Sequence, residues 1–136
     1  MESRNRHRLL GLLLLGGLAL SQVVAAQGGP PDSLPPGVSA KMVQDGKALW
    51  SGAGLCLACH GPEGKGGIGP DLTDGKWDHI NGSYRELVAR VIKGVMPDES
   101  KSGQIMPPRG GGGLSDDQVK AVAAYVWTIS RRHARD

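Results

Sequence analysis

The two cysteines of the chain lie three residues apart, and a histidine follows the second one directly, in Cys56-Leu57-Ala58-Cys59-His60. Two thiols and an imidazole at this spacing suit three kinds of site: a redox-active dithiol, half of a zinc site, or the covalent attachment point of a c-type haem. A structural disulfide is a fourth interpretation. Such a disulfide would close almost no loop, so it would stabilise the chain little.

The residues around the cysteine pair separate these interpretations. A thioredoxin-like dithiol needs a βαβ setting, whereas this sequence predicts helices and glycine-rich loops. His79 or His133 could complete a zinc site on paper, but His60 directly follows Cys59, which makes tetrahedral ligation by both awkward. Haem attachment accounts for every residue, because two thiols form the thioethers and His60 supplies an axial nitrogen. The sequence therefore predicts one haem c, held through Cys56 and Cys59.

The second axial ligand of the iron has five candidates: Met42, Met96, Met106, His79 and His133. Met42 lies on a predicted helix, where methionine usually packs. His133 lies in a charged tail, and His79 has the features of a surface loop histidine. Met96 and Met106 each precede a proline, which favours an extended backbone and stiffens the loop. The second proline and the glycine run that follow favour Met106, with Met96 as the alternative.

One helix is predicted before the cysteines and another after them. Ser39 is a suitable N-cap for a first helix that runs to about Ser51 and leads into the cysteine pair. Ser83 and Glu86 have the spacing of a capping box for a second helix, whose apolar residues recur at helical spacing. Gly94 is a suitable stop for that helix.

A third helix is predicted near the carboxyl end. It begins with a capping box of Ser115 and Gln118, with Leu114 and Val119 spaced as a hydrophobic staple. Its apolar stripe consists of Val119, Val122, Val126 and Ile129. Because no alternating strand pattern appears, the fold class is predicted to be all-α. The chain has 22 glycines and no phenylalanine, so a bound cofactor is expected to fill a core that side chains leave thin.

The first 26 residues have the pattern of a secretory signal peptide. Arg4, Arg6 and Arg8 precede a short apolar run, and small residues follow it. An uncleaved membrane anchor is the alternative, but the run falls short of the ~20 residues that span a bilayer. The formal net charge of +3 owes much to these arginines, so the charge does not indicate nucleic-acid binding.

The predicted organisation is a single domain with short flanking segments. Export through this signal places the protein in the periplasm, and after cleavage no stable membrane insertion is expected. The segments are a signal peptide at 1–26, a proline- and glycine-rich linker at 27–38, the folded domain at 39–132 and a tail at 133–136.

These features together resemble the class I cytochromes c, from about Ser39 to Ser130. The matching elements are Gly46-Lys47-Ala48-Leu49-Trp50, the attachment stretch 56–60, Gly69-Pro70-Asp71-Leu72, Met106-Pro107, and Leu114-Ser115 leading into Ala123-Ala124-Tyr125-Val126-Trp127. The resemblance implies three main helices and long Gly/Pro-rich loops around one covalent haem.

The resemblance also implies roles for individual residues. The carbonyl of Pro70 would accept a hydrogen bond from His60 and fix the orientation of its ring. Leu72 would pack on the haem, and Met106 would be the distal ligand. Gly46 would let the first helix cross closely against the last.

The expected function follows from this ligation. A histidine and a methionine together raise the reduction potential and leave no open site for catalysis. We therefore expect an electron carrier, not an enzyme, that moves single electrons between a dehydrogenase or respiratory complex and an acceptor such as a terminal oxidase. The alternatives are a haem enzyme or gas sensor with an open distal site, and a dedicated haem subunit of a dehydrogenase complex. The expected partners are redox proteins, and the chain is expected to be a monomer or a subunit of a complex.

Overall fold

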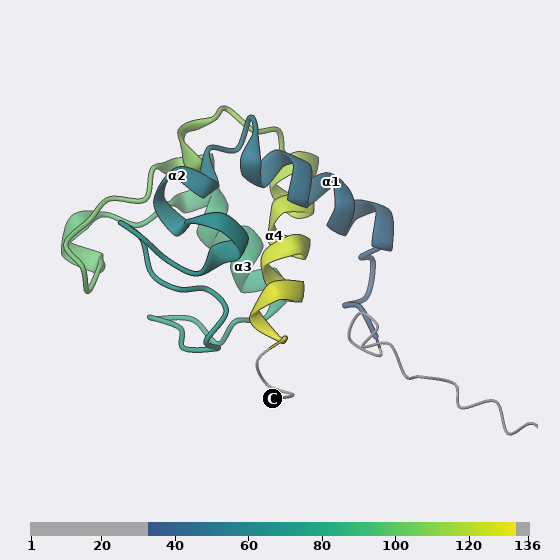
Figure 1. Ribbon diagram of the computed structural model, residues 1–136, viewed down its shortest axis with the longest axis horizontal. Helices are drawn as coiled ribbons and strands as arrows, with labels where there is room; N and C mark the ends of the chain where they lie inside the picture. Colours follow the sequence, from purple (N-terminus) through teal and green to yellow (C-terminus); the bar gives the residue numbers. More distant parts are fainter. Residues whose placement is uncertain (1–32, 133–136) are drawn as a thin grey trace, which may run out of the picture.

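The computed structural model describes residues 33–132, which form four α-helices joined by loops and short 3-10 turns (Figure 1). The helices are α1 (Ala40–Ser51), α2 (Cys56–His60), α3 (Tyr84–Lys93) and α4 (Asp116–Ser130), and the turns are η1 (Pro62–Gly64), η2 (Pro97–Glu99) and η3 (Pro108–Gly111). Within this range the strand-type pairing is an isolated antiparallel bridge between Val95 and Met106. The all-α prediction is confirmed.

The helix α1 crosses α4 (Figure 1), and the two helices pack against each other. A Cβ atom added to Gly46 would lie 1.9 Å from the carbonyl oxygen of Ala121, so only a glycine fits at this crossing. Beside it, the rings of Trp50 and Tyr125 meet edge to face with their centroids 5.6 Å apart. The predicted role of Gly46 in this helix crossing is confirmed.

The helix α4 is the centre of the fold. Its predicted apolar stripe is buried: Val119, Val122, Val126 and Ile129. Burial extends to all sides of this helix, and every residue from 121 to 130 is buried. The reason is that α1, α3 and η1 all pack against it. The buried hydroxyl of Thr128 donates a hydrogen bond to the Ala124 carbonyl at 2.9 Å, so its burial leaves no polar group without a partner.

Two helices begin as the sequence predicts. At α1, the Ser39 hydroxyl accepts a hydrogen bond from the Met42 amide at 3.2 Å. At α4, the Ser115 hydroxyl accepts from the Gln118 amide at 3.3 Å, and the Gln118 side chain accepts from the Ser115 amide at 2.9 Å. This reciprocal pair is the predicted capping box. Leu114, the residue before it, is buried as expected of a staple residue.

The start of α3 differs from the prediction. The helix begins after Ser83, but the Ser83 side chain makes no capping hydrogen bond. Glu86 instead accepts a hydrogen bond from the Asn81 amide at 2.7 Å, and the Asn81 side chain accepts from the Ser83 amide at 2.9 Å. The predicted capping box is therefore wrong, because the preceding turn brings Asn81 closer to Glu86. The predicted end is confirmed: Gly94 has a φ of +75° and donates its amide to the Arg90 carbonyl at 2.8 Å.

The packed part of the chain includes the end of the predicted linker. Leu34 is partly buried against the hydrophobic core, so packing begins before Ser39. The predicted signal peptide, the first part of the linker and the tail at 133–136 lie outside the described residues. Among the residues that are described, no helix is long and apolar enough to cross a membrane.

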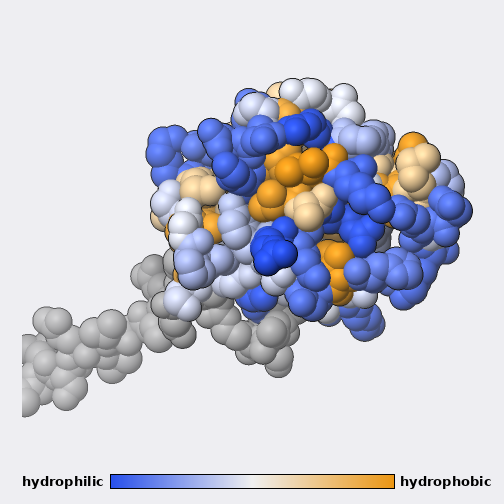
Figure 2. Space-filling model, turned by 180° about the vertical axis from the view of Figure 1, so that it is seen from behind, coloured by the Kyte–Doolittle hydropathy of each residue, from blue (hydrophilic) through white to orange (hydrophobic). Residues whose placement is uncertain are grey.

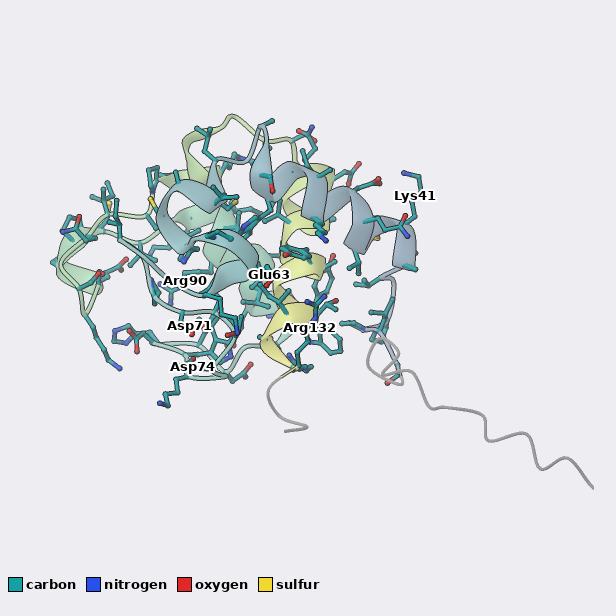
Figure 3. The ribbon with its side chains drawn as sticks, viewed as in Figure 1. Lys41, Glu63, Asp71, Asp74, Arg90 and Arg132 are labelled. Carbon is teal, nitrogen blue, oxygen red and sulfur yellow. The ribbon has the colours of Figure 1, made fainter. Side chains whose placement is uncertain are left out.

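Charged side chains of both signs are spread over the surface. Figure 3 shows Lys41 near the start of α1, Arg132 beyond the end of α4, and Asp74 in the loop that follows η1. Lys41 pairs with Asp45 at 2.7 Å, and both side chains are largely exposed. Exposed pairs of this kind contribute little to stability, so the fold depends on the packing around α4.

Candidate cofactor site

A mostly apolar pocket opens beside α2. Its lining includes both cysteines, His60 and the apolar side chains of Leu55, Ile68, Leu72, Trp77, Ile80 and Met106. A haem needs such an apolar pocket, with two thiols at one edge and an imidazole beneath the iron. The apolar lining, the two thiols and the imidazole of this pocket therefore fit a c-type haem.

Backbone conformation confines the attachment residues to one short helix. Leu55 precedes α2 with a φ of +56°, and Gly61 ends it with a φ of +72°. A Cβ atom at Gly61 would lie 2.5 Å from the carbonyl oxygen of Gly66, so the chain can turn back here only with glycine. The single turn between Leu55 and Gly61 brings Cys56, Cys59 and His60 to the same pocket.

His60 is held with its ring in one orientation and one tautomer. It is buried, and its Nδ1 lies 3.0 Å from the carbonyl oxygen of Pro70. Because a carbonyl can only accept, Nδ1 carries the proton and Nε2 keeps a free lone pair. Burial lowers the pKa of His60, against the opposing effect of the Pro70 hydrogen bond. The ring is therefore neutral near pH 7, which is the state that binds a metal.

Trp50 also supports His60, and this contact was not predicted from the sequence. Its indole nitrogen donates to the Gly61 carbonyl at 3.3 Å, immediately after α2. Its ring centroid lies 5.8 Å from that of His60. In the sequence, Trp50 is only part of the stretch 46–50 that matches the class I cytochromes c, because its link to His60 depends on how α1 and α2 meet in space.

The two cysteines have different surroundings and do not form a disulfide with each other. Cys56 is buried and Cys59 is half-buried. The Cys56 thiol donates a weak hydrogen bond to the Gly54 carbonyl at 3.3 Å. Burial raises the pKa of the Cys56 thiol to about 11, so this sulfur is protonated at neutral pH before a thioether forms.

The structure separates the candidate distal ligands. Met106 is half-buried and lines the same pocket as His60. Met96 is 51% exposed and is not part of the pocket lining. His79 is exposed at the pocket rim, Met42 lies on α1 away from the lining, and His133 is outside the described residues.

The backbone of Met106 is fixed by the end of α3. The Val95 amide donates to the Met106 carbonyl, and the Met106 amide donates to the Val95 carbonyl, both at 2.9 Å. A Cβ atom at the neighbouring Gly94 would lie 2.4 Å from the Met106 carbonyl oxygen. The close approach of these two segments therefore requires glycine at position 94.

We expect Gly94→Ala to displace the Met106 segment. The new methyl group meets the Met106 carbonyl, and alanine is also strained at a φ of +75°, by about 1–2 kcal/mol. The expected result is faster cyanide binding to the ferric haem protein, measured by stopped-flow absorption. Gly103→Ala is the matched control, because Gly103 has a φ of +66° with nothing within 4 Å. Equal cyanide rates in the two variants would contradict the prediction.

Other pocket walls come from loops without periodic sequence patterns. The amide of Leu72 donates to the Gly64 carbonyl at 2.8 Å, which holds Leu72 against the pocket. Trp77 is packed so closely on Gly82 that a Cβ atom there would lie 2.1 Å from the indole nitrogen. The sequence identifies Leu72 through the family resemblance, whereas the position of Ile80 in the wall has no local signal.

The mouth of the pocket is apolar, and an ion pair lies beside it. Leu55, Ile68 and Ile105 line it and are each more than half exposed. Lys101 pairs with Asp78 beside this rim. Figure 2, which views the molecule from behind, shows hydrophobic residues gathered in the middle of one face and surrounded by hydrophilic ones.

A helical fold around an apolar pocket, with a Cys-X-X-Cys-His helix at its edge, defines a class I c-type cytochrome domain, whose cofactor is a single covalent haem c. Residues 41–126 match the family described as cytochrome C oxidase, cbb3-type, subunit III. Because this match covers more than half of the chain, the chain belongs to that family.

Curated relatives agree with this assignment. The chain is 36% identical over 81 residues to the cbb3-type cytochrome c oxidase subunit CcoP of Rhodobacter capsulatus, covering 54% of this chain and 25% of the relative. It is 34% identical over 93 residues to the subunit of the same name from Rubrivivax gelatinosus, covering 65% of this chain and 26% of the relative. The chain thus spans about a quarter of the length of these relatives. No solved structure matches it.

Proposed function

We propose that this protein is a one-electron carrier domain in which Cys56 and Cys59 hold the haem through thioethers and His60 and Met106 occupy the two axial positions. When bound, haem c supplies an iron that alternates between the ferric and ferrous states. The observation that carries the proposal is the presence of His60 and Met106 in the lining of one apolar pocket. Two protein ligands leave no position for a substrate, so the domain itself is a carrier, not an enzyme.

The chain contributes orientation and exclusion of water. The Pro70 carbonyl holds the proton of His60 on Nδ1 and leaves Nε2 toward the pocket. Leu72, Trp77 and Ile80 cover the pocket walls. Because an apolar wall disfavours additional charge, it supports the less charged, reduced state of the centre.

We infer that the partners are other redox proteins of a respiratory chain. The relatives are named as subunits of a cbb3-type cytochrome c oxidase, which favours the haem-subunit alternative beside that of a free carrier. The apolar rim of Leu55, Ile68 and Ile105 offers a small docking surface of the kind that suits brief electron-transfer contacts. Residues 1–26, with the pattern of an export signal, support a periplasmic location.

Binding of carbon monoxide tests whether both axial positions of the haem iron are filled. We expect the absorption spectrum of the dithionite-reduced haem protein to stay unchanged when carbon monoxide is added, because both axial positions are filled. A clear spectral shift would show an open sixth position and would favour the sensor or enzyme alternative.

The choice between free carrier and complex subunit needs a separate experiment. The full chain, tagged at its carboxyl end and expressed with its native signal, is isolated from solubilised membranes and from the periplasmic fraction. A haem-containing oxidase that remains bound through both isolation steps would support the subunit. A lone haem protein that bacterial membranes oxidise would support the free carrier.

A further inference from the structure

The segment between Met106 and α4 contains an arginine in an unusual backbone conformation. Arg109 has a φ of +55°, in the left-handed region that residues other than glycine rarely adopt. Its side chain lies outside the pocket lining. Strain of this kind persists only where the surrounding contacts impose it, so the contacts of the guanidinium group are informative.

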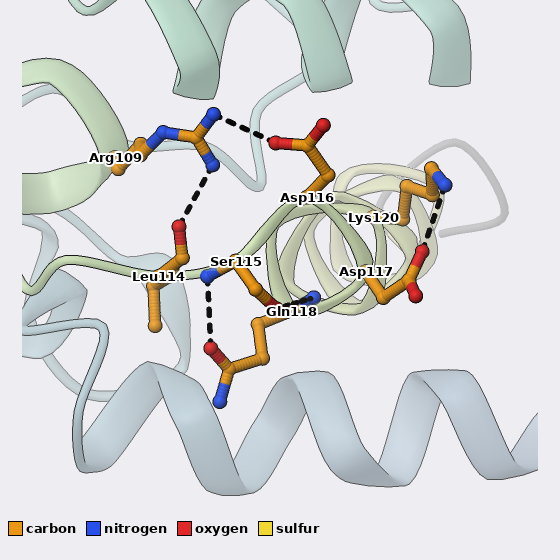
Figure 4. Close-up of polar contacts among 7 residues, drawn as sticks. All are labelled: Arg109, Leu114, Ser115, Asp116, Asp117, Gln118 and Lys120. Carbon is orange, nitrogen blue, oxygen red and sulfur yellow. Dashed lines mark hydrogen bonds and ion pairs between the residues drawn. The ribbon is translucent and has the colours of Figure 1, made fainter.

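The guanidinium group of Arg109 bridges to the start of α4 (Figure 4). Its Nη1 donates to the Leu114 carbonyl at 2.7 Å. Its Nη2 donates to the Asp116 carboxylate, also at 2.7 Å. Two short hydrogen bonds from one planar group fix both the distance and the angle between the turn η3 and the helix.

The start of α4 is a firm anchor for this bridge. It carries the Ser115–Gln118 capping box, and Leu114 is buried beside it. The glycine run after Arg109 also lies against the segment that precedes the attachment helix. A Cβ atom at Gly112 would lie 1.8 Å from the Ala53 carbonyl oxygen, and one at Gly110 would lie 2.4 Å from that of Gly54.

The Met106 segment is therefore held at both ends. On one side the paired backbone bonds join it to Val95. On the other side, three residues after Met106, Arg109 ties the chain to α4. The backbone at Met106 can move away from the pocket only if one of these connections opens.

We propose that Arg109 is a positioning residue that keeps Met106 against the haem iron. Its two hydrogen bonds to Leu114 and Asp116 fix the loop to the start of α4 and are called the latch below. This inference rests on the proposed ligation by Met106. Loss of the latch lets the loop lift more often, so an external ligand replaces the Met106 sulfur faster. Since the Asp116 side chain is 68% exposed, the effect is moderate: about a three- to tenfold faster replacement.

Three variants of the haem-loaded full chain test the latch, alongside two controls. Arg109→Gly removes the side chain and relieves the positive φ, whereas Arg109→Lys keeps the charge but not the two-armed geometry. Asp116→Asn weakens one of the two contacts. Asp117→Asn is the matched control, because Asp117 lies in the same first turn but pairs with Lys120 at 2.8 Å.

The measurement is the rate of cyanide binding to the ferric protein, with the near-infrared absorption band of thioether-bound ferric haem as an equilibrium readout. We expect a three- to tenfold faster rate for Arg109→Gly, smaller increases for Arg109→Lys and Asp116→Asn, and the wild-type rate for Asp117→Asn. Ser39→Ala removes a helix cap far from the loop and controls for a general loss of stability. It is expected to bind cyanide at the wild-type rate.

Two results would overturn the latch, and they are distinguishable. If the wild type shows the thioether band and resists carbon monoxide, but Arg109→Gly and Asp116→Asn bind cyanide at the wild-type rate, Met106 is the ligand and Arg109 does not position it. If the wild type itself lacks the band and binds carbon monoxide, the ligation by Met106 fails and the latch fails with it. Should Arg109→Gly not fold, Arg109→Lys and Asp116→Asn give the same comparison.

Discussion

Replacing Met106 with alanine is expected to convert a closed haem site into an open one. The variant keeps His60, both cysteines and the apolar walls, so haem attachment is retained. Without the thioether sulfur, the reduced protein binds carbon monoxide, and the near-infrared band of the ferric protein disappears. The reduction potential falls by roughly 0.1–0.3 V, within the ~0.8 V range that axial ligands span. Optical titration and carbon monoxide binding measure both effects.

Met96→Ala is the matched control for this experiment. Met96 also precedes a proline, but it is 51% exposed and does not line the pocket. We expect this variant to keep the wild-type spectrum, potential and resistance to carbon monoxide. A variant Met106→His separates the loss of sulfur from the loss of any ligand, because a second imidazole keeps the site closed while lowering the potential. If Met96→Ala opened the site and Met106→Ala did not, the ligand assignment would be reversed.

Replacing Gly46 with alanine is expected to destabilise the fold by roughly 2–4 kcal/mol. At an exposed helix position, a glycine-to-alanine change stabilises by about 1 kcal/mol. At Gly46 the added methyl group would lie 1.9 Å from the Ala121 carbonyl oxygen and 3.0 Å from the Cβ of Tyr125. Because most of these contacts are with backbone, α1 must move away from α4, and such overpacking costs more than the gain in propensity.

Denaturant unfolding of the haem-loaded protein, followed by circular dichroism, measures this effect. Ala48→Gly is the control, because Ala48 is exposed on the same helix. It is expected to lose about 1 kcal/mol from helix propensity alone. A gain in stability on Gly46→Ala would show that α1 and α4 do not cross at this residue.

Local signals in the sequence predicted much of the fold. The starts of α1 and α4 follow from Ser39 and from the Ser115 capping box, because the donors and acceptors of these caps lie within three residues of each other. The helix α3 starts where the sequence predicts, but the capping box predicted at its start does not form. Glu86 pairs with Asn81 instead of with Ser83, since the turn before the helix offers a competing amide that spacing alone does not reveal.

The candidate site likewise has features that the sequence predicts and contacts that only the tertiary structure reveals. The spacing of Cys56, Cys59 and His60, together with the predicted helices and glycine-rich loops around it, predicted the cofactor. Thiols three residues apart and an adjacent imidazole are neighbours on one helical turn. The second proline and the glycine run of the sequence favoured Met106 over Met96, and the tertiary structure places Met106, not Met96, in the pocket lining with that turn. It likewise brought the indole of Trp50 to His60 and the guanidinium of Arg109 to α4, since contacts between separate elements depend on how the chain packs around α4.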